Sequence, residues 1–260
     1  MYTKSRDAGI YLGRDAGRDL YNTILNANKS VKIVSPYLNP DYIKKLVNLK
    51  EKGVDVTLIT SDYLEEKTEE GPYGPYSSHM NFIKQDRKID EDSVRRRSTN
   101  IRFTFACLVI SIALMILGVF NIILSIIGLI GLLLIFFGIW ACLQTVIYSY
   151  SYYPIFRLRV FFSKSWGSYL IHAKIYVIDD KVAFLGSTNF TYSGCVKSYE
   201  SSIKITDPYA VGFISREVDN LFNNTQLQFL NIQEWGKKLY AEPPHELSYW
   251  QIIGSSLSSK

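Results

Sequence analysis

The 260-residue chain has few cysteines and few histidines. Its three cysteines are widely spaced and odd in number: Cys107, Cys142 and Cys195. Its three histidines are His79, His172 and His245. No cluster of Cys and His exists in the sequence, which argues against a disulfide framework and against a zinc site. We therefore expect a chemistry that uses neither a metal nor another cofactor.

Strong charge and an apolar start are also missing. The formal net charge is +5, which permits a phosphate-bearing partner without requiring one. No apolar stretch begins the chain, so we expect no cleavable signal peptide. With 47% hydrophobic residues, the chain is long enough for one domain with a full core, or for a domain plus membrane segments.

One long segment contains no charge at all. The 45 residues from Phe103 to Ile147 include no Asp, Glu, Lys or Arg. As a single helix they would extend about 68 Å, roughly twice a hydrocarbon core of about 30 Å. This length predicts two membrane spans with a turn near Asn121. A helical hairpin buried in a soluble protein is the alternative.

Basic residues flank this segment on both sides: Arg95, Arg96, Arg97 and Arg102 before it, and Arg157, Arg159 and Lys164 after it. The predicted turn carries no charge, so the positive-inside rule places both flanks in the cytoplasm. We expect an integral membrane protein with two transmembrane helices, whose catalytic domain and termini are cytoplasmic. The aromatic residues within 148–156 predict an interfacial belt; a strand that enters the core is the alternative.

A dense polar motif follows, with the sequence IHAKIYVIDDKVAFLGSTN from Ile171 to Asn189. Its polar residues have the pattern H-x-K, four residues, D, six residues, G-S-x-N. Residues 170–178 are rich in β-branched and aromatic types, which predicts a strand, and a second strand is expected over 182–186. A buried hairpin with incidental polar residues is the alternative.

Strand geometry divides the motif residues between two faces. His172 and Lys174 share one face, because side chains alternate along a strand. Asp179 falls on the opposite face, at or past the strand end, which indicates a supporting role. Ser187 and Asn189 follow the second strand, a usual place for a site on an α/β scaffold.

This motif resembles the HKD signature of the phospholipase D superfamily, whose members cleave phosphodiesters. The resemblance implies that His172 attacks phosphorus and forms a phosphohistidine. It also implies that Lys174 and Asn189 bind the nonbridging oxygens and that Ser187 helps by hydrogen bonding.

A carboxylate on the second ring nitrogen would hold the imidazole in the required tautomer. Family members often carry a Glu shortly after G-S-x-N, and Glu200 is the candidate here, at the start of a strand predicted over 201–206. Asp179 is the other acidic option, and we include both among the candidate catalytic residues. A surface Glu at a strand edge is the alternative for Glu200.

The chain carries a single motif, because neither His79 nor His245 has a Lys two residues further on. In this respect it resembles the single-motif bacterial nucleases and the mitochondrial membrane-anchored phospholipase D. The resemblance implies a homodimer in which two copies of His172 face each other. One copy would be the nucleophile and the other the acid, which predicts a bell-shaped pH dependence.

The region before the hairpin has an α/β pattern. Helices are predicted over 19–27 and 41–52, and strands over 31–35 and 54–60, so parallel pairing is expected. Asn39 and Pro40 form a helix start, and Gly53 ends that helix. The stretches KSVKIVSPYL and KGVDVTLIT also resemble the first half of a phospholipase D-type domain.

The expected fold class is therefore α/β. It is a phospholipase D-like sandwich with a mixed or parallel sheet flanked by helices, interrupted by a two-helix transmembrane hairpin. The expected parts are the first half of the domain, a charged leader, the hairpin, the second half with the motif, and a tail: 1–60, 61–100, 101–147, 148–225 and 226–260. Residues 81–97 of the leader are compatible with a helix that extends the first span. Two separate small domains are the weaker alternative.

These expectations define a function. We expect a membrane-anchored phosphodiesterase, with a phospholipid slightly favoured because the hairpin holds the site near lipid headgroups. The alternatives are a membrane-tethered, metal-independent endonuclease acting on DNA or RNA, and a non-enzymatic membrane scaffold. The expected partners are a second copy of the chain, membrane lipid and, for the endonuclease, nucleic acid.

Overall fold

The computed structural model describes residues 2–4, 8–62, 81–162 and 171–240. Several predictions fall outside these residues: the strand start at Leu170, the placement of His79 and His245, and the last 20 residues of the tail. The chain divides into two compact units, Met1–Gln85 with Tyr152–Tyr240, and Asp86–Ser151 with Ala241–Lys260. The first unit holds the motif, and the second holds the apolar hairpin.

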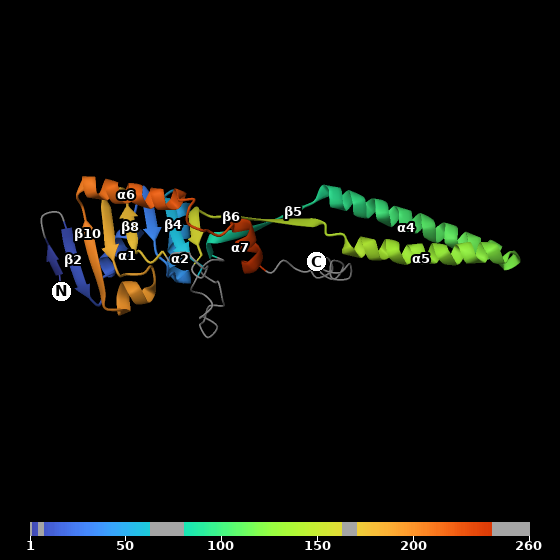
Figure 1. Cartoon of the computed structure of the whole chain (residues 1–260), viewed down its shortest axis with the longest axis horizontal. Coiled ribbons are helices and arrows are strands. Elements are labelled where there is room, and N and C mark those ends of the chain that lie inside the picture. Colours follow the sequence, from blue (N-terminus) through green and yellow to red (C-terminus); the bar gives the residue numbers. More distant parts are fainter. Residues whose placement is uncertain (1, 5–7, 63–80, 163–170, 241–260) are drawn as a thin grey trace. The chain divides into compact units, whose positions relative to one another are not determined.

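The first unit is built on an eight-stranded sheet with the order β1-β2-β10-β9-β8-β3-β4-β7 (Figure 1). In chain order its strands are β1 (Tyr2–Lys4), β2 (Ala8–Gly13), β3 (Ser30–Val34), β4 (Asp55–Ser61), β7 (Arg157–Phe161), β8 (Ile175–Ile178), β9 (Val182–Gly186) and β10 (Glu200–Ile205). The helices of this unit are α1 (Arg18–Leu25), α2 (Pro40–Glu51), the π-helical turn η3 (Ser193–Lys197), α6 (Pro208–Asn223) and α7 (Ile232–Leu239).

Strands that precede the hairpin in the sequence and strands that follow it are interleaved within this sheet. β3 pairs in parallel with β4 on one side and antiparallel with β8 on the other. β4 pairs in parallel with β7, and β10 pairs antiparallel with β2. The sheet is therefore mixed, with helices packed against it, which confirms the predicted α/β fold class.

Helix α6 covers one face of the sheet, and its contacts follow from strand alternation. Lys32 on β3 points to this face and donates to Ser215 Oγ at 2.8 Å and to Asp219 Oδ2 at 2.6 Å. Val177 and Ala183 of the neighbouring strands pack against Val211 of α6. The polar contacts fix the position of the helix, and the apolar ones bury its inner face.

The opposite face carries the aromatic core behind the motif. The ring of Tyr42, on α2, lies 5.2 Å from that of Phe190, and Tyr176 on β8 contacts Phe190 at 6.3 Å between centroids. Helix α2 starts as predicted, because the Asn39 side chain accepts the N–H of Asp41. Gly53 follows its end with a φ of 91°, a conformation that favours glycine.

Strands β5 (Ile83–Ile89) and β6 (Tyr148–Pro154) form a two-stranded sheet, and this corrects two predictions. The leader helix covers only part of 81–97: residues 83–89 form β5, because pairing with β6 overrides helix propensity, whereas from Glu91 onward the chain is helical and extends the first span as predicted. The aromatic belt over 148–156 is wrong in part. Tyr152 and Phe156 are 2% and 4% exposed, so they belong to the core, in agreement with the alternative of a strand.

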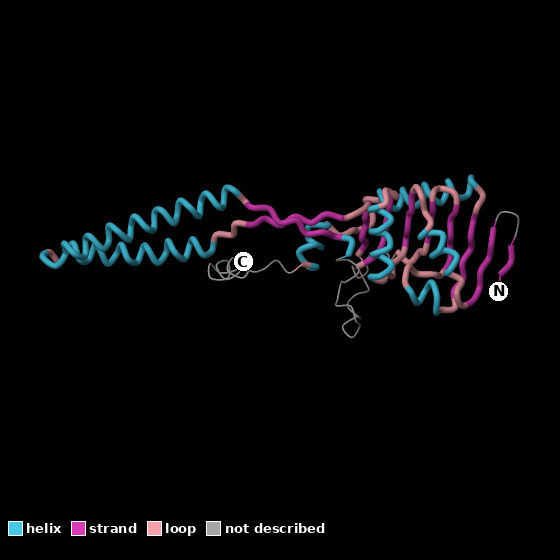
Figure 2. Tube along the Cα trace, turned by 180° about the vertical axis from the view of Figure 1, so that it is seen from behind, coloured by secondary structure: helices cyan, strands magenta, loops and turns pink. Residues whose placement is uncertain are grey.

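The second unit contains the hairpin, with α4 (Glu91–Leu117), the short turn η2 (Gly118–Phe120) and α5 (Ile122–Gln144) (Figure 2). By length and composition, both helices are apolar enough to cross a membrane. The turn lies where it was predicted, with Asn121 as the N-cap of α5. Helix α4 begins ten residues earlier than the predicted start of the hairpin at residue 101 and is capped by the Asp90 side chain.

Small residues let the two helices approach closely. A Cβ on Gly131 would lie 2.1 Å from Ser111 Oγ, and a Cβ on Gly138 would lie 2.4 Å from Thr104 Oγ1. Such contacts between glycine and short hydroxyl side chains are common between membrane helices, where backbones can pack without intervening bulk.

Candidate active site

The motif residues gather at one edge of the sheet because neighbouring strands run in opposite directions. β3 and β9 end at this edge, while β8 and β10 begin there. Tyr176 Oη donates to the backbone oxygen of Thr188 at 2.7 Å, and the N–H of Phe190 donates to Ser35 Oγ at 3.0 Å. These hydrogen bonds hold residues 187–190 against β8 and against the end of β3.

His172 and Lys174 form the centre of the candidate site. Lys174 Nζ lies 2.9 Å from His172 Nδ1 and 3.2 Å from Nε2, and it donates to the His172 backbone oxygen at 2.7 Å. The strand is shorter than predicted: β8 begins at Ile175, and residues 171–174 precede it without regular structure. The hydrogen bond from Lys174 Nζ to the His172 backbone oxygen holds this irregular segment in place.

The two side chains differ in their access to solvent. His172 is exposed, whereas Lys174 is 6% exposed. Burial lowers the pKa of the Lys174 ammonium below its ordinary value, and the nearby Glu200 carboxylate acts in the opposite direction. A cation in this environment is poorly solvated, so it interacts strongly with an anionic group that enters the site.

The sequence predicts a contact between Glu200 and the imidazole, but the structure gives Glu200 another partner. Its carboxylate accepts a very short hydrogen bond from Ser187 Oγ, and Ser187 Oγ in turn accepts the N–H of Ser201 at 3.0 Å. Among the described residues, Glu200 thus acts on Ser187 rather than on His172. Its charge still reaches Lys174, so it belongs to the same electrostatic site.

Asn189 lies at the same edge, after the end of β9. Its Oδ1 is buried and has no hydrogen-bond partner among the residues that the structure describes. Its backbone oxygen accepts the N–H of Thr191 at 2.8 Å, which fixes the position of the residue. Buried amide oxygens are normally satisfied, so Oδ1 calls for a hydrogen-bond donor, and Nδ2 is the atom of this side chain that can donate to a phosphate oxygen.

Asp179 is not brought together with these residues. It lies in the turn after β8, and five residues of extended chain separate it from Lys174 by about 16 Å. Its carboxylate accepts N–H groups of Asn28, Lys29 and Ser30 at distances from 2.7 to 3.2 Å. This position corrects the inclusion of Asp179 among the candidate catalytic residues, and it fits the supporting role that alternation predicted.

Sequence reasoning missed Tyr37. This residue follows β3, and its ring meets that of His172 edge to face with centroids 6.2 Å apart. Lys174 Nζ lies 5.9 Å from the same ring. A signal was present, because Tyr37 closely follows the end of a predicted buried strand, a usual place for site residues.

No group of three or more His, Cys, Asp or Glu side chains within the described part of the chain is arranged to hold a metal ion. The candidate site therefore consists of a histidine, a buried lysine, an amide and a hydroxyl–carboxylate pair. These are the groups that metal-free attack on a phosphodiester needs: a nucleophile, fixed positive charge and hydrogen-bond donors.

Residues 148–225 match a family model described as "Cardiolipin synthase, PLD-like domain". That segment contains the whole motif. This segment is a phospholipase D-like domain. The mixed α/β sheet flanked by helices described above is the fold predicted for such a domain.

Comparison of this chain with solved structures gives weaker likenesses. NucT from Helicobacter pylori is 15% identical, with 88% of this chain and 100% of NucT covered and a TM-score of 0.43. Nuc from Salmonella typhimurium is also 15% identical, with 86% and 99% covered and a TM-score of 0.40. A phosphatidylserine synthase from Haemophilus influenzae Rd KW20 is 13% identical, with 98% and 46% covered and a TM-score of 0.41. No curated protein matches the chain.

Proposed function

We propose that this protein is a membrane-anchored phosphodiesterase that hydrolyses a phospholipid through a phosphohistidine on His172. The observation that carries the proposal is an exposed imidazole with the buried Lys174 ammonium 2.9 Å from its Nδ1. The two apolar helices support a lipid substrate, since a hairpin in a bilayer keeps the domain close to headgroups.

The proposed reaction has two displacements. In the first, a ring nitrogen of His172 attacks phosphorus; a P–N bond forms, and the P–O bond to the leaving alcohol breaks. In the second, the oxygen of a water molecule attacks phosphorus, the P–N bond breaks and the imidazole is regenerated. Lys174 and the Asn189 amide bind the nonbridging oxygens in both steps. Ser187 helps indirectly, because its hydroxyl proton is donated to Glu200 and its oxygen accepts the N–H of Ser201.

The proposal includes a homodimer because one motif supplies one histidine. The leaving oxygen needs a proton in the first step, and the attacking water must lose one in the second. We propose that His172 of a second copy gives the first proton and receives the second. One copy then acts unprotonated and the other protonated, and this requirement produces a bell-shaped pH profile.

A membrane-tethered endonuclease is the second candidate. It is favoured by the net charge of +5, because basic proteins attract the phosphate backbone of nucleic acids. Its binding should weaken steeply with salt, whereas cleavage of a lipid should depend on the headgroup that a vesicle presents.

The test uses the purified full chain in nanodiscs with EDTA. Labelled phospholipid and single-stranded oligonucleotides are offered in parallel, and the His172→Asn variant is the control. We expect phospholipid cleavage that falls by about a thousandfold or more in the variant, as when a nucleophile is removed. Oligonucleotide cleavage alone would establish the endonuclease. Activity on neither substrate, or activity equal in both proteins, would contradict the proposal and favour a scaffold.

A further inference from the structure

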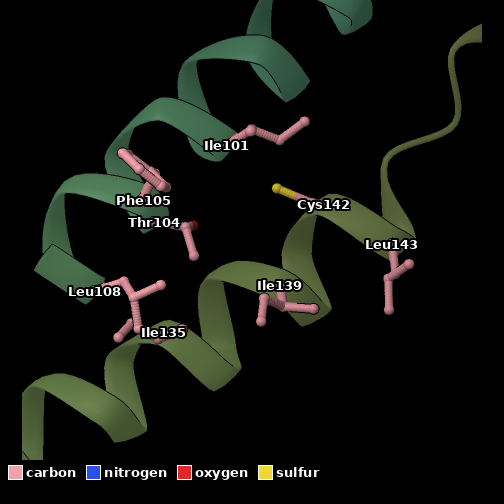
Figure 3. Close-up of a pocket in the computed structure, with 8 residues that line it drawn as sticks. All are labelled: Ile101, Thr104, Phe105, Leu108, Ile135, Ile139, Cys142 and Leu143. Atoms are coloured by element: carbon pink, nitrogen blue, oxygen red, sulfur yellow. The ribbon is translucent and has the colours of Figure 1, made fainter.

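The hairpin has an apolar cavity between its helices (Figure 3). The cavity has a volume of about 310 Å³ and lies toward the start of α4 and the end of α5, away from the turn. Its principal lining residues are Ile101, Phe105 and Leu108 of α4 and Ile135, Ile139 and Leu143 of α5. A space lined in this way does not hold ordered water, because it offers almost no polar partners.

The position of the cavity follows from the helix packing. Gly138 and Thr104 bring the backbones together, so the long side chains beside this contact cannot fill the space between the helices. In a bilayer, the molecules at hand to fill such a space are acyl chains.

A basic pocket lies on the same helix, one turn nearer its start. It has a volume of about 520 Å³ and is lined by Arg95, Ser98, Thr99 and Arg102, together with one carboxylate, Glu91. Arg95 and Arg102 are seven residues apart with Ser98 between them, so all three lie along one side of α4. Two guanidinium groups and the Ser98 hydroxyl form a suitable donor set for a phosphate, whereas the Thr99 hydroxyl already donates to the backbone oxygen of Arg95 at 3.0 Å.

The basic pocket and the apolar cavity are neighbours on the helix surface. Ser98 lies three residues before Ile101, and Arg102 lies three residues before Phe105, spacings at which helix side chains meet. A molecule that occupies both spaces needs an anionic group at one end and a hydrocarbon chain at the other.

We propose that the hairpin binds an anionic phospholipid as a specific ligand. The headgroup phosphate lies between Arg95 and Arg102 with a hydrogen bond from Ser98, and one acyl chain fills the cavity beside Phe105 and Ile139. This inference rests on the membrane anchoring in the proposed function, but it does not depend on which substrate His172 attacks.

The experiment measures the lipid that the full chain retains. All proteins carry the His172→Asn substitution, so that the enzyme cannot hydrolyse the bound lipid. The protein is reconstituted in nanodiscs of phosphatidylcholine with a minor fraction of phosphatidylglycerol, and the lipids that stay bound are counted by native mass spectrometry. We expect phosphatidylglycerol to be retained in preference to phosphatidylcholine. The Arg102→Gln variant should retain at least about tenfold less, because a hydrogen-bonded contact to the phosphate is lost in addition to general attraction.

A matched variant separates a site from general attraction. Arg97→Gln removes the same charge from the same turn of the chain, but Arg97 lines neither pocket. It should reduce retention by no more than about fivefold, the general attraction of one arginine near an anionic surface, and so by less than Arg102→Gln. Equal losses from Arg97→Gln and Arg102→Gln would overturn the inference, because they would show attraction of anionic lipid to the surface as a whole.

The binding of the acyl chain is tested by filling the cavity with a larger side chain. Ile139→Trp should reduce retention, whereas Ile130→Trp, at an exposed position outside the cavity, should not. Both variants are checked for helix content by circular dichroism. Retention that survives Ile139→Trp, or a protein that does not enter the bilayer, would overturn the inference. Selective retention, together with a wild-type protein that shows no diesterase activity, would overturn the proposed function alone.

Discussion

At the scale of the residue, the least expected contact is that between Glu200 and Ser187. Sequence reasoning paired Glu200 with the imidazole, whereas its carboxylate accepts from Ser187 Oγ. Burial and the Glu200 charge act in opposite directions on the pKa of Lys174. Glu200 is therefore a positioning residue that orients a hydroxyl and adjusts the field at the lysine.

A double-mutant cycle tests this role. Glu200→Ala and Ser187→Ala should each lower kcat by about tenfold, and the double variant should lose much less than a hundredfold, because both remove the same hydrogen bond. If Glu200 instead held the tautomer of His172, the two losses would multiply, and Glu200→Ala alone would displace the pH profile of kcat/KM. The measurement is steady-state kinetics of the four proteins across pH.

The sequence could predict the local elements but not all of their partners. Asn39, Pro40 and Gly53 define α2 because caps act within a few residues. The partner of Glu200 depends on the pairing of β9 with β10, and the position of Tyr37 depends on the pairing of β3 with β8, which are distant in the chain. Strand β5 was missed for the same reason, since its charged sequence forms a strand through pairing with β6.

At the scale of the element, the turn between β8 and β9 ties the motif to the first half of the sheet. Asp179 and Asp180 both adopt positive φ, at 56° and 51°, a conformation that Asp and Asn tolerate. Burial works to raise the pKa of Asp179, but the backbone N–H groups of Ser30, Lys29 and Asn28 together outweigh it, so that pKa is lowered. The folded state therefore favours the ionised carboxylate.

Asp179→Asn isolates this charge while keeping a residue suited to the turn. Because the folded pKa lies below that of the unfolded chain, the stabilisation is present above about pH 4 and is lost as pH falls through the folded pKa. We expect the variant to be less stable by about 1–3 kcal/mol at pH 7, with the difference shrinking in acid. Urea unfolding of both proteins at pH 7 and in acid measures it, and a difference independent of pH would contradict the assignment.

At the scale of the whole molecule, the proposed dimer would make activity a property of an assembly. If each reaction needs His172 from two copies, a dimer with one His172→Asn subunit has either a nucleophile or an acid, but not both. Activity then depends on the number of intact pairs rather than on the number of intact chains.

Subunit mixing distinguishes these cases. Wild-type and His172→Asn chains are coexpressed in equal amounts and purified together. We expect about one quarter of the wild-type activity per chain, since random pairing leaves one dimer in four intact. Activity near one half would show that each chain works alone, and the dimeric mechanism would then be wrong. Mixing with a wild-type chain in place of the variant is the control.

The insertion of the hairpin between β4 and β7 also sets the order of biosynthesis. After β4 leaves the ribosome, roughly 100 residues must be made before β7 and β8 can pair with it and with β3. At about 5–20 residues per second, this delay lasts many seconds. During that time β3 and β4 each have an edge without its final partner strand. The nascent chain should therefore need chaperone protection on the ribosome. Slower translation of the hairpin segment should increase aggregation of the incomplete sheet.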